Sequence, residues 1–248
     1  MVTLKSKREL EIMRDAGRIV AEILLILREH CRLGVKTRDL DRIAEEETLK
    51  RDARPAFKGY RGYPASLCTS INQEVVHGIP GSRELKEGDI VGLDFGVFYK
   101  GYCSDATITV PIGQVAPEVR DLLRVTEESL YRGIEQAVVG NHLVDISRAI
   151  QTHAESHGYA VVKELGGHGI GKRMHEEPMV LNYVTDGRGI KLQPGLVLAL
   201  EPMVNLGVDG VKTLADGWTV VTLDGKPSAH FEHTIAVTES GPDILTDM

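Results

Sequence analysis

The chain has 248 residues, of which 42% are hydrophobic and 26% charged, and its formal net charge is −7. A chain of this length and apolar content can bury a sizeable core, so we expect an ordinary globular protein and not a disordered one. The acidic balance argues against a general affinity for nucleic acid or anionic membranes. A basic cluster near the N-terminus is interpreted as the solvated face of a helix (Lys5, Lys7, Arg8, Arg14 and Arg18).

The cysteines and the lengths of the apolar runs indicate in which cellular compartment the protein works. Cys31, Cys68 and Cys103 are odd in number, widely spaced and without a CxxC motif, which favours a reducing, cytoplasmic setting over a disulfide framework. The first ten residues lack the apolar stretch of a signal peptide, and no apolar run is long enough to span a bilayer.

The pattern of apolar and turn residues predicts helices and strands in two successive sets. Ser6 and Glu9 form a capping-box signature for a helix that runs through Leu27, with Gly34 as its stop, and a second, charged helix is expected over 37–50. A loop over 57–64, interrupted strands over 65–80 and a β-hairpin over 89–110 follow, the hairpin turning near Lys100 and Gly101. Helices are expected over 117–139 and 142–157, and strands dominate thereafter.

An internal repeat relates the two sets. "LKEGDIVGLDFGV" (85–97) aligns without gaps on "LQPGLVLALEPMV" (192–204), and "DATITV" from Asp105 aligns on "EHTIAV" from Glu232. Two helices followed by strands therefore occur twice. We expect one catalytic domain over 1–248, built from two similar halves at about 1–112 and 113–248.

The repeat places two acids on strands in each half, Asp94 with Asp105 and Glu201 with Glu232. Asp94 and Asp105 are symmetric about a point between Tyr99 and Lys100, so simple pairing sets them opposite each other, unless a bulge at Gly101 shifts the register. One acid in a strand is more often a surface or ion-paired residue. Four of them among Ile, Val and Leu favour a bound cation instead, because buried charges are paired or bind metal.

Three of the histidines are candidates for the same site as the four acids. His168 lies among glycines in "GGHGIG", His175 precedes "EEP", and His77 occurs in "EVVHGIP". "HEEPM" is not the zinc-protease motif HExxH, and its proline opposes a helix. By strand alternation His230 shares the face of Glu232 and could support the site, whereas His233 points away. The remaining candidates are treated as structural and without partner acids (His30, His142, His153 and His157).

Four carboxylates with one imidazole form a hard, oxygen-rich ligand set. Such a set suits two ions such as Mn, Fe or Co better than one tetrahedral zinc. Two ions about 3.5–4 Å apart would activate a water molecule and polarise a carbonyl, which is hydrolase chemistry.

The order Asp94, Asp105, His168, Glu201, Glu232, together with "HGIG", "HEEP", "GYRGYPASLCTSIN", "VVHGIPG" and "FEHTIAV", resembles the type I methionine aminopeptidases over nearly the whole chain. The resemblance implies an α+β pita-bread fold, in which two pseudo-symmetric halves form a central antiparallel sheet covered by helices. We expect the protein to lack the long N-terminal domain of prolidases, the helical insert of type II enzymes and the N-terminal extensions of longer type I members.

The resemblance also implies roles for the site residues. Asp94 would bind one metal, Asp105 and Glu232 would bridge both, and His168 and Glu201 would complete the second. Glu201 would also shuttle the proton, His77 would contact the substrate amide or leaving group, and His175 the scissile carbonyl. The physiological metal could be Co, Mn, Fe or Zn.

The methionine pocket implied by the resemblance includes Tyr60, Tyr63, Cys68 and Trp218, which composition alone would assign to ordinary core. The chain departs from many relatives at Phe57 and Met174. Asn72 and Ser228 match positions at which relatives bind a monovalent cation.

The function implied is removal of the initiator methionine from nascent polypeptides with a small second residue, by a cytoplasmic monomer that meets its substrates at the ribosome. A prolidase-like hydrolase is one alternative, although proline-cleaving relatives usually carry a further His near Lys172. A metal-free peptide-binding protein on the same fold is the other.

Overall fold

The computed structural model describes residues 2–247, and these form four α-helices in two pairs: α1 (Lys7–His30), α2 (Thr37–Leu49), α3 (Pro117–Glu135) and α4 (Leu143–Ser156). Ser6 caps α1 as predicted, since its side chain accepts from the Glu9 amide and the Glu9 carboxylate accepts from the Ser6 amide. The helix nevertheless ends at His30, with Cys31 as its C-cap, so the predicted stop at Gly34 is wrong. Gly34 has φ +81° and instead bonds Leu85 through its amide.

A large antiparallel sheet forms the centre of the molecule, with strand order β1-β4-β5-β14-β9-β7-β8; β2 also pairs with β4, and β15 with β14. Its members are β1 (Arg54–Pro55), β2 (Cys68–Ile71), β4 (Ile90–Tyr99), β5 (Tyr102–Pro111), β7 (Gly166–Gly169), β8 (Glu176–Leu181), β9 (Val197–Leu200), β14 (Glu232–Thr238) and β15 (Gly241–Ile244).

Two three-stranded sheets flank it, with the orders β13-β10-β6 and β11-β12-β3. Their strands are β3 (Glu74–Val76), β6 (Ala160–Val161), β10 (Met203–Asn205), β11 (Val211–Thr213), β12 (Val220–Thr222) and β13 (Ser228–His230). A 3₁₀ turn, η1 (Tyr60–Gly62), lies in the loop before β2.

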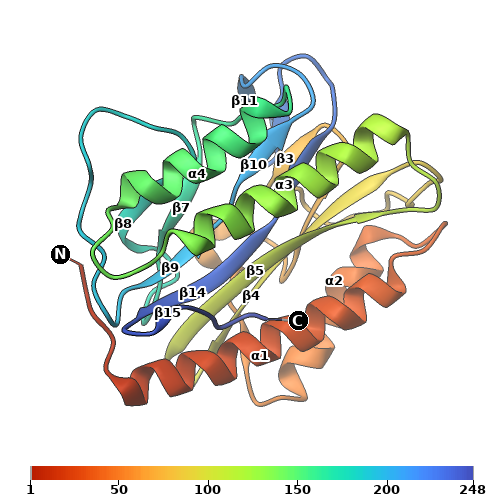
Figure 1. Ribbon diagram of the computed structural model, residues 1–248. Helices are drawn as coiled ribbons and strands as arrows, with labels where there is room; N and C mark the ends of the chain where they lie inside the picture. Colours follow the sequence, from red (N-terminus) through yellow and green to blue (C-terminus); the bar gives the residue numbers. More distant parts are fainter. Residues whose placement is uncertain (1, 248) are drawn as a thin grey trace.

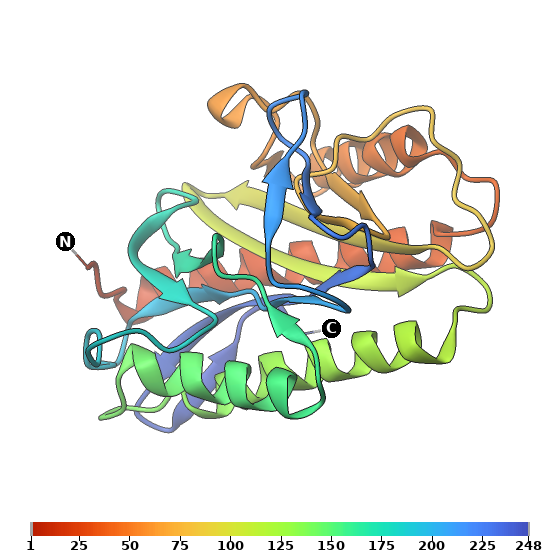
Figure 2. The same ribbon diagram turned by 90° about the horizontal axis from the view of Figure 1, so that it is seen from above.

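The helices cover one face of the large sheet, and α1, α3 and α4 stand in front of it in Figure 1. Alternate residues of each strand point to opposite faces, so one set packs on the helices and the other faces away. Phe95, Ile108 and Ile235 point to the helix side of the sheet and form one hydrophobic core with Val20 and Leu24 of α1. Figure 2 shows α3 on one side of the sheet, and the η1 loop (orange) and the β11–β12 hairpin (blue) on the other. The second face of the sheet is therefore available for a site.

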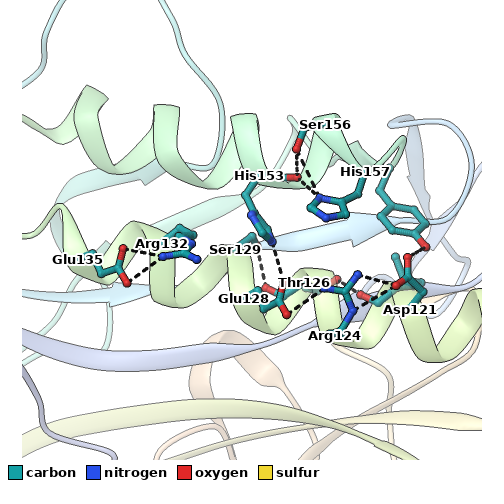
Figure 3. A network of polar contacts seen from close by, with 12 residues as sticks. Asp121, Arg124, Thr126, Glu128, Ser129, Arg132, Glu135, His153, Ser156 and His157 are labelled. Carbon is teal, nitrogen blue, oxygen red and sulfur yellow. Dashed lines mark hydrogen bonds and ion pairs between the residues drawn. The ribbon is translucent and has the colours of Figure 1, made fainter.

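The second helix pair is joined by polar contacts on its outer side (Figure 3). His153 of α4 lies with Nε2 3.0 Å from Oε2 of Glu128 on α3, and Arg124 binds the same carboxylate at 2.8 Å. The expectation that His153 has no partner acid is therefore wrong. The partner lies 25 residues away and is brought near by the packing of α3 on α4.

No helix within residues 2–247 combines the length and the apolarity that crossing a lipid bilayer requires.

Candidate metal centre and substrate pocket

The face of the sheet opposite the helices carries a row of polar residues on adjacent strands. β5 places Thr107 opposite Asp94 of β4 on one side and opposite Glu232 of β14 on the other. Glu201 comes directly after β9, whose last residue, Leu200, pairs with His233. The same register continued by one residue sets Glu201 beside Glu232, so acids from both halves meet in one row.

A second row runs parallel to the first, two residues along each strand and so on the same face. It contains Asp105 of β5 and His168 of β7, with Thr234 and Ala199 between them. Ala199 pairs with both Thr234 and His168, and the Thr234 hydroxyl lies 3.2 Å from Oδ1 of Asp105. The small side chain of Ala199 leaves the space between the two ligand types open.

The predicted direct opposition of Asp94 and Asp105 is wrong. The hairpin turns on Lys100 (φ +47°) and Gly101 (φ +84°), the two positive φ angles of a type I′ turn, so Tyr99 pairs with Tyr102. Asp94 then faces Thr107, and Asp105 faces Gly96. A shift of two residues leaves both acids on the same face as diagonal neighbours.

Glu201 was expected within a strand but follows one. Pro202 has no amide hydrogen to donate to a ladder, and the chain leaves the large sheet there to form β10 in a flanking sheet. The two halves differ at this point, because in the first half the corresponding strand, β4, runs unbroken through Asp94. It turns Glu201 toward the cavity while its backbone carbonyl accepts from Asn182.

These residues form the floor of one cavity, which is lined by Phe57, Tyr60, Arg61, Tyr63, Cys68, His77, Asp94, Asp105, His168, Met174, His175, Glu201, Trp218 and Glu232. The structure thus brings together every residue that the sequence suggested for metal binding, catalysis and the methionine pocket. Asn72 and Ser228 lie outside it, where the Ser228 amide donates to the Asn72 carbonyl at 2.9 Å.

The carboxyl groups of the floor repel one another in a dry environment. Burial, and then the charge of Asp105, raise the pKa of Asp94 to about 8, while burial raises that of Asp105 to about 6. Burial and neighbouring acids also hold the pKa values of Glu201 and Glu232 well above their usual range. Within residues 2–247, no lysine or arginine pairs with any of the four. A cation is needed if these groups are to be charged together.

His168 presents a lone pair to this cluster. Its Nδ1 lies 2.9 Å from the Gly169 carbonyl, which can only accept, so Nδ1 carries the hydrogen and Nε2 is free. Nε2 lies 3.6 Å from Oε1 of Glu201 and 3.9 Å from Oδ2 of Asp105. One ligand atom each from Asp105, His168 and Glu232 lie within 4.8 Å of one another. The oxygen and nitrogen donors of this cluster, their burial and the lack of a pairing lysine or arginine within residues 2–247 all fit the binding of divalent metal ions.

Two further histidines line the cavity above the floor. The His175 ring lies 4.1 Å from that of His168 between centroids, and the Tyr60 phenol oxygen lies 2.9 Å from its Nδ1. His77 has φ +60° and faces Trp218 edge-on at 6.3 Å. Burial lowers the pKa of His77, and burial with the proximity of His168 lowers that of His175 to about 4. Both rings are neutral at pH 7 and able to donate through N–H.

Aromatic and sulfur-bearing side chains wall the cavity. Tyr63 packs edge-on against Trp218 at 5.1 Å, and its hydroxyl donates to the Gly78 carbonyl at 2.9 Å, with the Leu67 carbonyl 3.1 Å away as a second acceptor. Cys68 pairs with Asp94 between β2 and β4, which fixes the wall against the floor. Phe57 and Met174, where the chain departs from many relatives, line the same space and are buried.

Sequence reasoning missed several residues of the site. Thr107 donates to Oε2 of Glu232 at 2.8 Å, and Thr234 contacts Asp105. Each stands two residues after an acid in "DAT" or "EHT", so strand alternation could have found both. Arg61 also lines the cavity, and no sequence signal marked it.

His233 points away from the floor as expected, but His230 ends β13 in a flanking sheet whereas Glu232 begins β14 in the large sheet, so alternation along one strand is not what places His230 near the site. His230 points Nε2 at Oε2 of Glu201 across 3.8 Å, and this buried nitrogen has no hydrogen-bond partner among residues 2–247. His233 faces the helix side, where it contacts Thr246 and Tyr131.

Comparisons with known proteins agree with this geometry. Metallopeptidase family M24 matches residues 11–239. The methionine aminopeptidase of Clostridium perfringens is 54% identical over 246 residues, 99% of each chain. The crystal structure of methionine aminopeptidase from Rickettsia prowazekii superposes with a TM-score of 0.98 at 40% identity, covering both chains fully. The predicted pita-bread fold is thus confirmed.

The prolidase-like alternative receives less support. The prolidase from Pyrococcus furiosus matches with a TM-score of 0.80, but at 22% identity and over 65% of its own length, which shows a shared fold alone. The match to methionine aminopeptidases is closer in both sequence and extent. The chain belongs to metallopeptidase family M24, in which its full-length relatives are methionine aminopeptidases.

Proposed function

We propose that this protein is a dinuclear metal-dependent aminopeptidase that removes the initiator methionine from polypeptides with a small second residue. The observation that carries the proposal is the buried floor of four carboxylates and one imidazole, without basic partners, beneath an aromatic cavity. The donor set supports hydrolysis at this floor, and the names of the full-length relatives, together with the aromatic walls, support selection of methionine.

Asp94, Asp105, His168, Glu201 and Glu232 would hold two divalent ions. Bound there, the ions would supply Lewis-acid activation of water and of the scissile carbonyl. Co, Mn, Fe and Zn are all compatible with this oxygen-rich set.

Glu201 is proposed to move the proton. It lies at the end of the row, with Oε1 3.6 Å from Nε2 of His168 and Oε2 3.8 Å from Nε2 of His230, which supports this role. It would accept a proton from the attacking water and pass it to the departing amine.

His175 and His77 are proposed to bind the substrate backbone. When the Tyr60 hydroxyl donates to Nδ1 of His175, Nε2 carries the hydrogen and can donate to the scissile carbonyl. His77 lies beside Trp218 and would contact the amide or the leaving group. Both rings stay neutral because burial lowers their pKa values.

Tyr60, Tyr63, Cys68 and Trp218, joined by Phe57 and Met174, would enclose the methionine side chain. An unbranched thioether makes favourable contacts with aromatic rings and fills irregular space well. A monovalent cation is proposed near Asn72 and Ser228, whose backbones adjoin outside the cavity.

The proposed substrates are the N-termini of nascent chains, met at the ribosome by a monomer in the cytoplasm. The three cysteines are free, as a reducing compartment requires.

A peptide panel tests the proposal directly. Metal-free protein would be supplied separately with Mn, Fe, Co and Zn, and assayed on Met-Ala, Met-Phe and Xaa-Pro peptides. Metal-dependent release of methionine from Met-Ala is expected. Preferred cleavage before proline would support a prolidase-like enzyme, and peptide binding without metal uptake would support a metal-free binding protein.

A further inference from the structure

A buried ion pair lies just behind the cavity and has no part in the proposed chemistry. The Lys5 ammonium lies 2.8 Å from Oε2 of Glu176, and the two side chains are only 3% and 9% exposed. The ammonium also donates to the Thr3 carbonyl. The partners are 171 residues apart and come from different halves of the fold. Burying two charges is costly, so this pair needs an explanation beyond surface polarity.

Glu176 directly follows His175 and begins β8. Its second oxygen, Oε1, accepts from the Arg173 amide at 3.2 Å. The Glu176 carboxylate is thus hydrogen-bonded to the backbone of the turn 171–175, and Lys5 in turn fixes the position of the carboxylate. This turn connects the strand that carries His168 to the one that follows His175.

Lys5 is itself firmly placed. Its amide donates to the Gly195 carbonyl at 2.7 Å, and the next residue, Ser6, caps α1. Its side chain crosses Gly171 so closely that a Cβ on that glycine would lie 2.6 Å from the Lys5 Cε and 2.8 Å from the Glu176 carboxylate. The turn is packed on the lysine stem as well as bound through its charge.

We infer that Lys5 is a positioning residue for His175: through Glu176, the segment before α1 holds the turn that sets the imidazole over the floor. The inference rests on the proposed function, because it takes His175 as a group that contacts the substrate. Lys5 touches neither the cavity nor the floor. Its loss would act on turnover through the imidazole and leave metal uptake intact.

The first test replaces Lys5 by Met, which keeps the length of the stem and removes the charge. Arg14→Met is the matched control, because Arg14 also ties α1 to a distant acid, Asp243, but away from the cavity. Displacing a catalytic group by about 1 Å can cost about 100-fold. We expect Lys5→Met to lower kcat about 10- to 100-fold with KM and metal affinity unchanged, and Arg14→Met to leave kcat near that of the unmodified protein.

A double-mutant cycle separates positioning from general destabilisation. In a His175→Ala background, Lys5→Met should cause no further loss of kcat, because it acts through the ring already removed. Lys5→Met with Glu176→Gln leaves neither position of this pair charged, so its melting temperature should recover while its kcat stays low. Full recovery of kcat in that double variant, or an additive loss beside His175→Ala, would overturn the inference. The double variant also keeps the test open if Lys5→Met alone folds poorly.

A measurement independent of activity distinguishes this inference from the proposed function. In metal-free protein labelled with ¹³C-histidine, Lys5→Met should shift the ring signals of His175 and leave those of exposed His30 unchanged. Unmoved His175 signals would refute the positioning role. If they shift although the unmodified protein cleaves no methionyl peptide, the positioning stands and the proposed function fails.

Discussion

The phenol oxygen of Tyr60 lies 2.9 Å from Nδ1 of His175, so the η1 loop of the first half reaches a residue of the second half across the cavity. Tyr60→Phe removes this contact and keeps the ring. A hydrogen bond of this kind contributes about 0.5–1.5 kcal/mol, so kcat/KM for Met-Ala should fall about 2- to 10-fold. Tyr131→Phe is the control, since Tyr131 contacts His233 on the helix side. Equal effects of the two changes would dismiss the orienting role of Tyr60.

His168 and His175 lie 4.1 Å apart between ring centroids but are predicted to behave differently. His168→Ala should weaken metal binding and activity together, because Nε2 faces the carboxylates. His175→Ala should keep metal and lose about 10²–10³ in kcat, the usual cost of removing one transition-state donor. Metal titration by calorimetry, paired with steady-state kinetics, checks both. Metal loss in the His175 variant with retention in the His168 variant would invert the assignment.

Thr107 joins the two halves of the acid row by donating to Glu232 while standing opposite Asp94. Thr107→Val should lower metal affinity or activity about 10- to 100-fold, as is typical when a partner of a metal ligand is removed. Thr126→Val is a matched control, because Thr126 is also buried but donates to Leu122 within α3. Calorimetric affinities that do not differ between these variants would count against Glu232 as a ligand.

Substrate choice should follow the enclosed shape of the cavity. Peptides with Gly, Ala or Ser after methionine should be cleaved, and those with Lys, Phe or Leu poorly. Apolar pockets discriminate by about 1–3 kcal/mol for each misfitted group, or about 10- to 200-fold in kcat/KM. Norleucine should be accepted because it is nearly isosteric with methionine. Comparable rates for Met-Gly and Met-Phe would disprove the proposed selectivity.

Metal-free protein should lose stability as pH rises. Burial raises the pKa of Asp105 to about 6, and burial together with the charge of Asp105 raises that of Asp94 to about 8, from about 3.9 in unfolded chains. A raised carboxyl pKa means that folding favours the protonated form, so the stability it contributes is present below about pH 4 and is lost as pH rises through 6 and 8. The melting temperature should therefore fall between pH 6 and pH 8, and saturating metal should flatten the slope.

Asp105→Asn provides the matching variant for this pH dependence. It should abolish activity, since a proposed metal ligand loses its charge, yet raise the melting temperature of metal-free protein at pH 8. Its slope between pH 6 and pH 8 should be shallower, because the charge of Asp105 no longer raises the pKa of Asp94. A steeper slope, or normal turnover under saturating metal, would contradict the role assigned to Asp105.

The amino-acid sequence by itself determined which chemistry the chain can perform and much of its local structure. The Ser6–Glu9 cap, the turn at Lys100 and Gly101 and the helix pairs follow from short-range preferences that neighbouring residues satisfy among themselves. The acids on one strand face and the glycine-flanked His168 follow from alternation and the internal repeat. Each of these signals depends on neighbouring residues or on a repeated segment, so the sequence alone is enough to predict it.

Only the tertiary structure decided how these groups meet. Centring the type I′ turn between Lys100 and Gly101, not one residue earlier, made Asp94 and Asp105 diagonal neighbours. Pro202 ended β9 before Glu201, and Glu128 came to pair with His153 through helix packing. The bond from Lys5 to Glu176 spans 171 residues. The pairs of Glu128 with His153 and of Lys5 with Glu176 depend on how distant elements pack together, and no local pattern encodes them, because each partner taken alone has the sequence environment of an ordinary surface residue.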